Sequence, residues 1–262
     1  MIYQAVHGIA LTTEQIRQLG DREWISRHAR HVHKDKVNIV AEIDLTIDGN
    51  TRAVVIKHFG WRNTLSRLLS PLMRSRAKKS WDASHWLLTH GVGVPRPLAA
   101  CTLRRWGFIV VNFLITEKIA DYTAARKKLR QPETSFQERS AIIRHMAQMV
   151  RKIHQARLIH NDLTLGNFLV ANAQPDNIVL IDLNRLKRKL HLSRRARMQD
   201  LARMNVCQCH LDAEHAACGW DLLLRAYDEI EVAANRKALR RAIQKRSRRK
   251  MVKGFLSGKK TV

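Results

Sequence analysis

Acidic residues are scarce in this chain. Of its 262 residues, 22 are Asp or Glu and 48 are Lys or Arg, which gives a formal net charge of +26. A surface with this imbalance repels basic molecules and attracts polyanions. The candidates for a partner are nucleic acid, an anionic membrane surface and a strongly anionic substrate.

Cysteines and long apolar runs are also scarce. The four cysteines, at positions 101, 207, 209 and 218, do not form the framework of a disulfide-rich secreted domain. The longest strongly apolar run, "FIVVNFLI" at 108–115, is interrupted by Asn112 and is too short to cross a bilayer. The first 15 residues lack the basic start and apolar run of a signal peptide. We expect a cytoplasmic protein without a membrane span.

The first half of the chain has the pattern of a mainly antiparallel sheet with one major helix. Its predicted elements are a strand at 37–47, a hairpin turn at 48–50, a returning strand at 52–59, a helix at 64–90 broken near Pro71, and a buried strand at 107–116. Residues 91–100 read as a turn followed by an extended segment.

The second half has the pattern of a helical domain. Apolar residues at helical spacing predict a helix at 137–157, a short buried strand follows at 177–182, and the chain reads as helical from about 194 onward. The fold class is therefore α+β, with a sheet-rich lobe before a helical lobe. We expect boundaries at 1–116 for the first lobe, 117–235 for the second and 236–262 for a basic tail.

A cluster of polar residues lies in the segment "LIHNDLTLGNFLV" (158–170), which holds His160, Asp162 and Asn167 between apolar residues. Asp182 ends the next apolar strand, and Lys57 lies inside the apolar strand at 52–59. Phosphoryl transfer needs such a set, because the protein must position the phosphates and supply cations. A lysine can hold phosphates, amide and carboxylate oxygens can bind Mg²⁺, and an aspartate can accept the proton of the attacking hydroxyl.

These segments resemble the conserved motifs of protein kinases. "HNDLTLGN" is similar to the kinase catalytic loop, "VVIK" to the kinase lysine strand, and "IDLN" (181–184) occupies the place of the Asp-Phe-Gly segment. More narrowly, the chain resembles the lipopolysaccharide kinase family, the bacterial core heptose and Kdo kinases. That resemblance rests on residues 75–99, 158–170 and 178–187, and extends in order and spacing over roughly residues 20–210.

The resemblance implies a protein-kinase-like two-lobe fold and an ATP- and Mg²⁺-dependent kinase. It implies that Asp162 is the catalytic base, that Lys57 pairs with the α and β phosphates, and that His160 supports the loop. Asn167 and Asp182 would bind Mg²⁺. The hinge that holds adenine would consist of Glu117, Lys118 and Ile119.

The chain departs from the kinase pattern in two places. No G-x-G-x-x-G precedes Lys57, and the basic segment 27–36 is the candidate loop over the phosphates. The helix glutamate that pairs with the lysine in kinases would fall at Ser80 here. Asp82 is the nearest acid, but it lies about 200° around the helix from Ser80. We take Asp82 as the candidate partner of Lys57, which requires a shift of register; otherwise the pair is absent.

A second group of residues suggests metal chemistry. Cys207, Cys209, His210, His215 and Cys218 contain enough ligands for zinc, but their spacing is not that of a standard zinc finger. Small thiols buried in a helix explain the same pattern. We favour the buried helix.

Two basic segments carry interspersed apolar residues, at 61–79 and 236–260. Such a segment either packs its apolar side chains on its own lobe or lies on an anionic membrane. Each Lys or Arg near such a membrane contributes about 1 kcal/mol, so we expect membrane contact by at least one segment. A basic tail alone does not separate membrane from nucleic acid, but we do not expect nucleic acid as the partner.

The resemblance implies an ATP-dependent kinase of a heptose or Kdo hydroxyl in the lipopolysaccharide inner core. Its acceptor is a lipid-linked sugar, and the enzyme would be peripheral to the cytoplasmic face of the inner membrane. The alternatives are a kinase-like phosphotransferase for a soluble small molecule or a protein, and a catalytically weak kinase-like protein that binds anionic membrane or nucleic acid.

Overall fold

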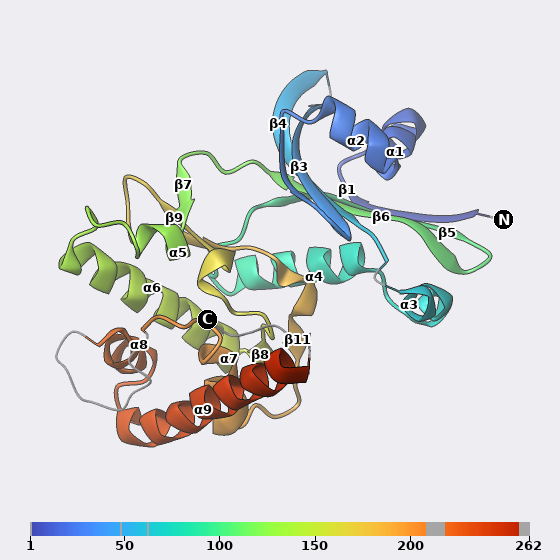
Figure 1. Ribbon diagram of the computed structural model, residues 1–262. Helices are drawn as coiled ribbons and strands as arrows, with labels where there is room; N and C mark the ends of the chain where they lie inside the picture. The colour runs from blue at the N-terminus through green and yellow to red at the C-terminus, as the bar shows by residue number, and fades with distance from the viewer. Residues whose placement is uncertain (1, 48, 62, 208–217, 257–262) are drawn as a thin grey trace. The chain divides into compact units, whose positions relative to one another are not determined.

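The computed structural model describes residues 2–47, 49–61, 63–207 and 218–256 (Figure 1). The chain divides into two compact units. Unit 1 comprises Met1–Thr89 and Val94–Ala120, and unit 2 comprises His90–Gly93 and Asp121–Val262.

Unit 1 is built on one six-stranded sheet in which every neighbouring pair of strands is antiparallel. The spatial order is β1-β5-β6-β4-β3-β2. The predicted hairpin and buried strand are confirmed as β3, β4 and β6. The bounds are β1 (Ile2–Gly8), β2 (His31–Asp35), β3 (Asn38–Ile47), β4 (Asn50–Phe59), β5 (Pro97–Arg105) and β6 (Phe108–Glu117).

Helices cover both faces of this sheet (Figure 1). On one face, α1 (Thr13–Gly20) and α2 (Arg22–His28) bury Ile16, Leu19 and Ile25 in the main core of the unit. On the other face, α4 (Arg76–Thr89) packs Ala77 against a smaller cluster that includes Phe59. Side chains two residues apart on a strand share a face, so Lys57 projects from the α4 side of the sheet.

The helical segment predicted at 64–90 is confirmed, with the break near Pro71. It consists of α3 (Thr64–Leu68), the 3₁₀ turn η1 (Ser70–Leu72) and α4. The polar residue that interrupts strand β6 has a structural role here. Asn112 is buried, and its Oδ1 accepts a hydrogen bond of 2.9 Å from the backbone N–H of Ala77. It thereby satisfies one of the open donors in the first turn of α4.

Unit 2 is mainly helical, as predicted. Its helices are α5 (Ala125–Lys128), α6 (Phe136–Gln155), α7 (Arg194–Leu201), α8 (Gly219–Tyr227) and α9 (Val232–Leu256). The predicted apolar stripe of α6 is buried, including Ile142, Met146 and Val150. The polar residues between positions 160 and 182 lie on or between short strands and 3₁₀ turns. The short strands and turns of the unit are β7 (Tyr122–Ala124), β8 (Leu158–Ile159), η2 (Leu165–Asn167), β9 (Phe168–Ala171), β10 (Ile178–Leu180), η3 (Leu183–Arg185) and β11 (Lys187–Arg188).

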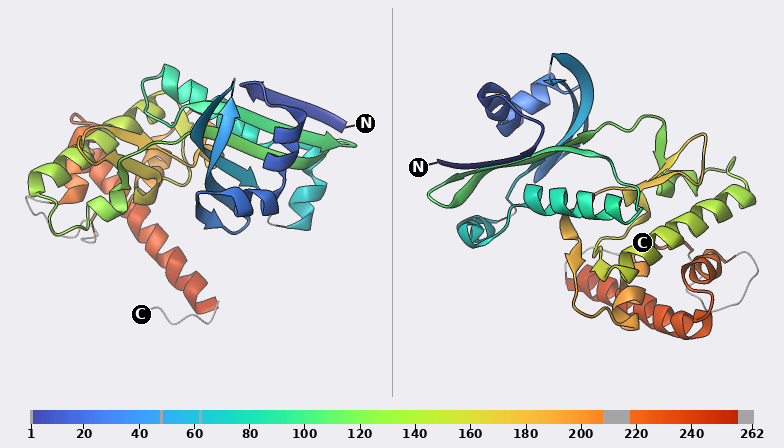
Figure 2. Two further views of the ribbon diagram at one scale, coloured as in Figure 1. Left: turned by 90° about the horizontal axis from the view of Figure 1, so that it is seen from above. Right: turned by 180° about the vertical axis from the view of Figure 1, so that it is seen from behind.

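Helix α9 contains much of the basic tail expected at 236–262. It buries Leu239 and Ile243 within unit 2, whereas Met251 and Val252 are exposed. Its last turns extend beyond the other helices of the unit (Figure 2, left). Two of the apolar residues that suggested membrane contact for this segment therefore belong to the core. Within the described ranges, no helix has the length and apolar character needed to span a membrane.

Two predicted features need separate comment. Residues 31–35 of the basic segment 27–36 form strand β2, which is exposed along its whole length and pairs with β3, so this part is an edge strand and not a loop. Charged residues are common on edge strands because they hinder pairing with other chains. Of the suggested zinc ligands, Cys209, His210 and His215 lie outside the described residues.

Candidate active site

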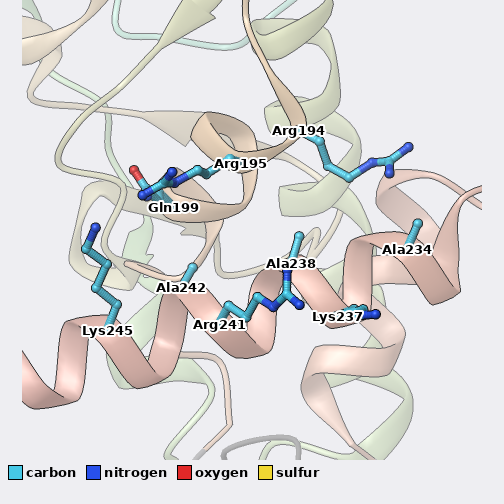
Figure 3. A pocket seen from close by; sticks show the side chains of 9 residues that line it. All are labelled: Arg194, Arg195, Gln199, Ala234, Lys237, Ala238, Arg241, Ala242 and Lys245. Atoms are coloured by element: carbon cyan, nitrogen blue, oxygen red, sulfur yellow. The ribbon is translucent and has the colours of Figure 1, made fainter.

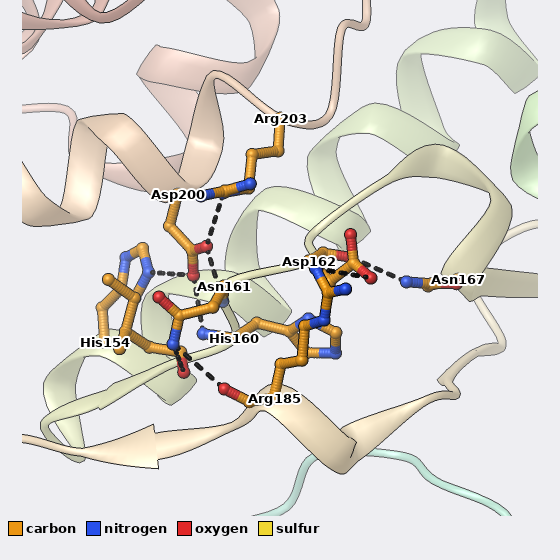
Figure 4. Close-up of polar contacts among 9 residues, drawn as sticks. His154, His160, Asn161, Asp162, Asn167, Arg185, Asp200 and Arg203 are labelled. Carbon is orange, nitrogen blue, oxygen red and sulfur yellow. Dashed lines mark hydrogen bonds and ion pairs between the residues drawn. The ribbon is translucent and has the colours of Figure 1, made fainter. Parts of the chain in front are cut away.

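The polar motif forms the loop between β8 and β9 in unit 2 (Figure 4). His160 is fully buried, whereas the side chain of Asp162 is one-third exposed. Burial lowers the pKa of His160, with smaller opposing effects from the charges of Asp200, Asp182 and Asp162. The imidazole is therefore a neutral part of the core at pH 7. The loop thus has a buried imidazole at His160 and a partly exposed carboxylate at Asp162.

A buried carboxylate on α7 holds the loop in place. Asp200 is 1% exposed, and its two oxygens accept hydrogen bonds from the backbone N–H groups of His160 (2.7 Å) and Asn161 (2.9 Å). Asn161 has a φ of 62°, in the left-handed region that asparagine tolerates better than most residues. Its side chain donates to the carbonyl oxygen of Arg185 at 3.0 Å. The backbone immediately before Asp162 is thus fixed from two directions.

Further polar residues surround Asp200. The Nε2 atom of His154 lies 3.5 Å from its Oδ2, and the Nε atom of Arg203 lies 3.8 Å from its Oδ1. The Nδ1 atom of His154 is 2.9 Å from the Tyr227 hydroxyl. Burial lowers the pKa of His154, although Asp200 opposes the shift, and burial raises the pKa of Tyr227 to about 12. The buried His154 imidazole and Tyr227 phenol are therefore neutral at pH 7, and the arginines Arg197 and Arg203 lie nearby.

Asn167 connects Asp162 to the segment that contains Asp182. Its side-chain amide donates to the backbone oxygen of Asp162 at 2.7 Å. Its own backbone oxygen accepts a hydrogen bond of 2.8 Å from the N–H of Ile181, the neighbour of Asp182. Asp182 has a φ of 62°, and its Oδ1 accepts a hydrogen bond of 2.5 Å from the side-chain amide of Asn184. The structure therefore brings together three of the residues singled out from the sequence.

This donor set is suitable for Mg²⁺. Because the Asn167 amide nitrogen is used by the loop, its oxygen is the atom left for a metal. That oxygen and the carboxylate of Asp182 are hard ligands of the type that Mg²⁺ prefers. The hydrogen bond between Asn167 and Ile181 keeps the two segments adjacent.

Arginine side chains lie beside the loop between β8 and β9. The Nη1 atom of Arg185 is 3.6 Å from Oδ2 of Asp162. Burial lowers the pKa of Arg246 on α9; the positive charge of Arg203 lowers it further, and the negative charge of Asp162 raises it. The Asp162 carboxylate is therefore close enough to α9 for its charge to act on Arg246.

The other predicted site residues belong to unit 1. Lys57 lies on β4, with its Nζ atom 5.6 Å from the centre of the Phe59 ring. Asp82 lies on α4, where it forms ion pairs with Arg74 and with Lys78, the latter at 2.7 Å. Both carboxylate oxygens of Asp82 therefore have cationic partners, one on α4 itself and one in the segment just before it. Whether Asp82 also serves Lys57 stays a prediction.

The predicted hinge begins at Glu117, the last residue of β6. The backbone N–H of Glu117 donates to the carbonyl oxygen of Arg96 at 2.9 Å. The Nζ atom of Lys118 lies 2.5 Å from the Glu42 carboxylate, and this contact is the main cause of the lowered pKa of Glu42. Ile119 is half-buried. The ion pair fixes the chain at Lys118, while the adenine role of the segment stays a prediction.

The sequence patterns did not reveal Asp200, Arg185 or His154. Asp200 is 40 residues from the backbone it holds, and no spacing rule links the two. Arg185 could have been noticed, because it follows Asp182 in the segment "IDLNR".

Comparisons with known proteins agree with this geometry. The family model described as "Lipopolysaccharide kinase (Kdo/WaaP) family" matches residues 27–227. The chain is similar to the solved structure "WaaP in complex with acyl carrier protein", with a TM-score of 0.59 and 19% sequence identity over 91% of this chain and 99% of that one. This similarity confirms the protein-kinase-like fold. No match was found among curated proteins.

Proposed function

Since the chain belongs to the lipopolysaccharide kinase (Kdo/WaaP) family, we propose that it transfers the γ-phosphate of ATP to a heptose or Kdo hydroxyl of the inner core. The family implies a kinase that phosphorylates a sugar hydroxyl, which supports an active enzyme over the alternative of a catalytically weak kinase-like binding protein. The observation that carries the proposal is the arrangement of Asp162, Asn167 and Asp182, joined by the two hydrogen bonds of Asn167.

Asp162 would act as the base. Its carboxylate is partly exposed, so an acceptor hydroxyl can reach it and pass it a proton as the oxygen attacks the phosphorus. The hydrogen bonds that Asp200 accepts fix the backbone before Asp162, and the one that Asn167 donates fixes the carbonyl oxygen of Asp162. This restraint matters because the base must stay within hydrogen-bond reach of the acceptor hydroxyl. Arg185 would keep the carboxylate oriented while no acceptor is bound.

Asn167 and Asp182 would hold Mg²⁺ through oxygen atoms, and Lys57 would pair with the α and β phosphates of ATP. When bound, Mg²⁺ supplies positive charge that neutralises the phosphate oxygens. The peptide backbone of residues 117–119 would hold the adenine. Asp82 would complete the nucleotide site only if it reaches Lys57 in addition to Arg74 and Lys78.

The acceptor is lipid-linked, and a surface of unit 1 is suited to a membrane. We define the apolar patch as Leu65, Leu68, Leu69, Leu72, Met73, Trp106, Phe108 and Val110, all exposed. Leu72 is 88% exposed and Trp106 is 73% exposed, values that are unusual for residues of this size.

Arg104 joins the two parts of the apolar patch. Its guanidinium donates to the backbone oxygens of Ser70 (3.0 Å), Gly107 (2.7 Å) and Met73 (2.7 Å), so η1 is tied to the β5–β6 turn. Exposed Arg67, Arg74 and Arg105 flank the patch. Apolar side chains among arginines are typical of surfaces that enter the headgroup region of an anionic leaflet. We propose that this patch holds the enzyme at the cytoplasmic face of the inner membrane.

An acceptor series would test the choice of sugar. Purified glycolipids that end in Kdo, or that carry one or two heptoses, would be incubated with the enzyme, ATP and Mg²⁺. The position of the new phosphate would then be mapped by tandem mass spectrometry. Phosphate on one of these sugars supports the proposal. Phosphate on none of them, with efficient labelling of a soluble metabolite or protein, would replace it with the alternative phosphotransferase.

A further inference from the structure

A pocket of about 610 Å³ lies between α7 and α9 in unit 2 (Figure 3). Its lining contains five cationic side chains, contributed by both helices: Arg194, Arg195, Lys237, Arg241 and Lys245. No acidic residue is among the lining residues that the structure describes. Ala234, Ala238 and Ala242, one helical turn apart on α9, add a wall without long side chains. This volume is in the range of sites for small molecules.

Most of the positive charge in the pocket is not neutralised by the protein. Arg194 forms an ion pair with Glu231. For Arg195, Lys237, Arg241 and Lys245, no carboxylate within the described part of the chain lies at ion-pair distance. Four like charges around one pocket repel each other, and an anionic ligand would relieve this repulsion. Two arginines and two lysines suit phosphate groups, which arginine can bind through two parallel hydrogen bonds.

The two helices that line the pocket also carry residues that interact with the β8–β9 loop. Helix α7 carries Arg195 in the pocket and Asp200, which holds the loop, about 8 Å further along the helix axis. Helix α9 carries Lys245 in the pocket and, next to it, Arg246, on which the charge of Asp162 acts. A ligand in the pocket is therefore close to the catalytic loop without occupying it.

We propose that this pocket binds a phosphorylated saccharide portion of the acceptor, remote from the hydroxyl that receives the new phosphate. The inference rests on the proposed function and adds to it a second contact for the acceptor. The phosphates contact the arginine and lysine side chains, and a sugar ring lies against the alanine wall. The contact increases the affinity for the acceptor without taking part in the chemical step.

The test uses a deacylated acceptor saccharide, which removes any effect of membrane binding. Its phosphorylated form and the same saccharide after phosphatase treatment are compared as substrates of the full chain. The variant is Arg241→Ala/Lys245→Ala. The matched control is Arg144→Ala/Arg151→Ala, which removes the same charge from exposed positions of α6.

With the phosphorylated saccharide, the pocket variant should raise the acceptor KM about tenfold or more, a loss expected for removed charge-assisted contacts. Its kcat and its KM for ATP should stay within about twofold of wild type, and the control variant should behave as wild type. With the dephosphorylated saccharide, wild type and pocket variant should have the same KM. An unchanged KM in the pocket variant, or an equal rise in the control, would overturn the proposal.

Direct binding separates this proposal from the proposed function. The probe is a bis-phosphorylated glucosamine disaccharide, titrated calorimetrically into each protein. If wild type transfers no phosphate to any saccharide yet binds the probe about tenfold more tightly than the pocket variant, the function is wrong and the pocket assignment stands. Equal binding by both proteins would refute the pocket assignment.

Discussion

Replacing Asp200 with asparagine should release the catalytic loop. In the wild type, two carboxylate oxygens accept backbone hydrogen bonds of 2.7 and 2.9 Å at a residue that is 1% exposed. Hydrogen bonds to a charged group contribute about 1.5–3 kcal/mol each, so the pair contributes about 3–6 kcal/mol. Asparagine keeps one acceptor oxygen, and the neutral hydrogen bond to that oxygen contributes about 1 kcal/mol. Its NH₂ group faces the other backbone N–H, so the second hydrogen bond is lost. We expect Asp200→Asn to cost about 2–5 kcal/mol of unfolding free energy.

The assay combines urea unfolding with steady-state kinetics. Since domains unfold with about 5–15 kcal/mol, the urea curve first establishes that the variant is folded in buffer, and the kinetics are then compared. Its kcat should fall about tenfold or more, because a shift of the backbone before Asp162 misplaces the base. The control is Asp176→Asn, an exposed residue of the same unit, which should change stability by less than about 0.5 kcal/mol. An Asp200→Asn variant with wild-type stability and kcat would refute the role of Asp200 as the loop anchor.

Three further predictions concern stability, metal and membrane. Burial lowers the pKa of His154 and of His160 in the folded protein. Below about pH 6.5, the pKa of a histidine in the unfolded chain, both rings therefore gain a proton when the protein unfolds. Stability should be full above about pH 6.5 and fall below it, by up to about 1.4 kcal/mol per pH unit for each ring, as measured by urea unfolding. Asn167→Ala should lower kcat about tenfold or more and raise the Mg²⁺ concentration at half-maximal rate. Leu72→Glu/Trp106→Glu should weaken sedimentation with anionic vesicles at least about 100-fold, because burial of each side chain contributes about 1.5–3 kcal/mol.

A specific result would contradict each of these predictions. A stability that is constant from pH 7.5 to 5.5 would contradict the neutral buried histidines. An Asn167→Ala variant with wild-type Mg²⁺ dependence would remove this residue from the metal site. Leu190→Glu changes an equally exposed leucine in unit 2 and should leave vesicle binding unchanged. Equal vesicle binding by wild type and the patch variant would rule out the apolar patch as the membrane contact.

Local patterns predicted the strands and helices that they encode directly. The alternation in β3 and β4 and the apolar stripe of α6 are properties of consecutive residues, and both were confirmed. Helix α1 was missed although its signal is local: Thr12 and Gln15 form a capping box at its start. Asn112 was noticed as a break in an apolar run, but its function depends on α4, which reaches it only through the fold.

The candidate site was predictable where its residues share one segment or one resemblance. His160, Asp162, Asn167 and Asp182 lie on two short segments that the fold places side by side. Asp200 could not be predicted, because an isolated aspartate in a basic helix has no local pattern that indicates its partners. The cationic pocket likewise requires α7 and α9 to pack together, which charge counts along the chain do not show.

The central claim is that Asp162 promotes phosphate transfer to the lipopolysaccharide core. The most direct measurement is transfer from γ-labelled ATP, with Mg²⁺, to purified deep-rough lipopolysaccharide by wild type and by Asp162→Asn. We predict labelled glycolipid with wild type and a rate at least about 100-fold lower with the variant, while both proteins bind ATP equally. Equal labelling by the two proteins would contradict the role of Asp162. ATP binding without any labelled glycolipid would contradict the proposed acceptor.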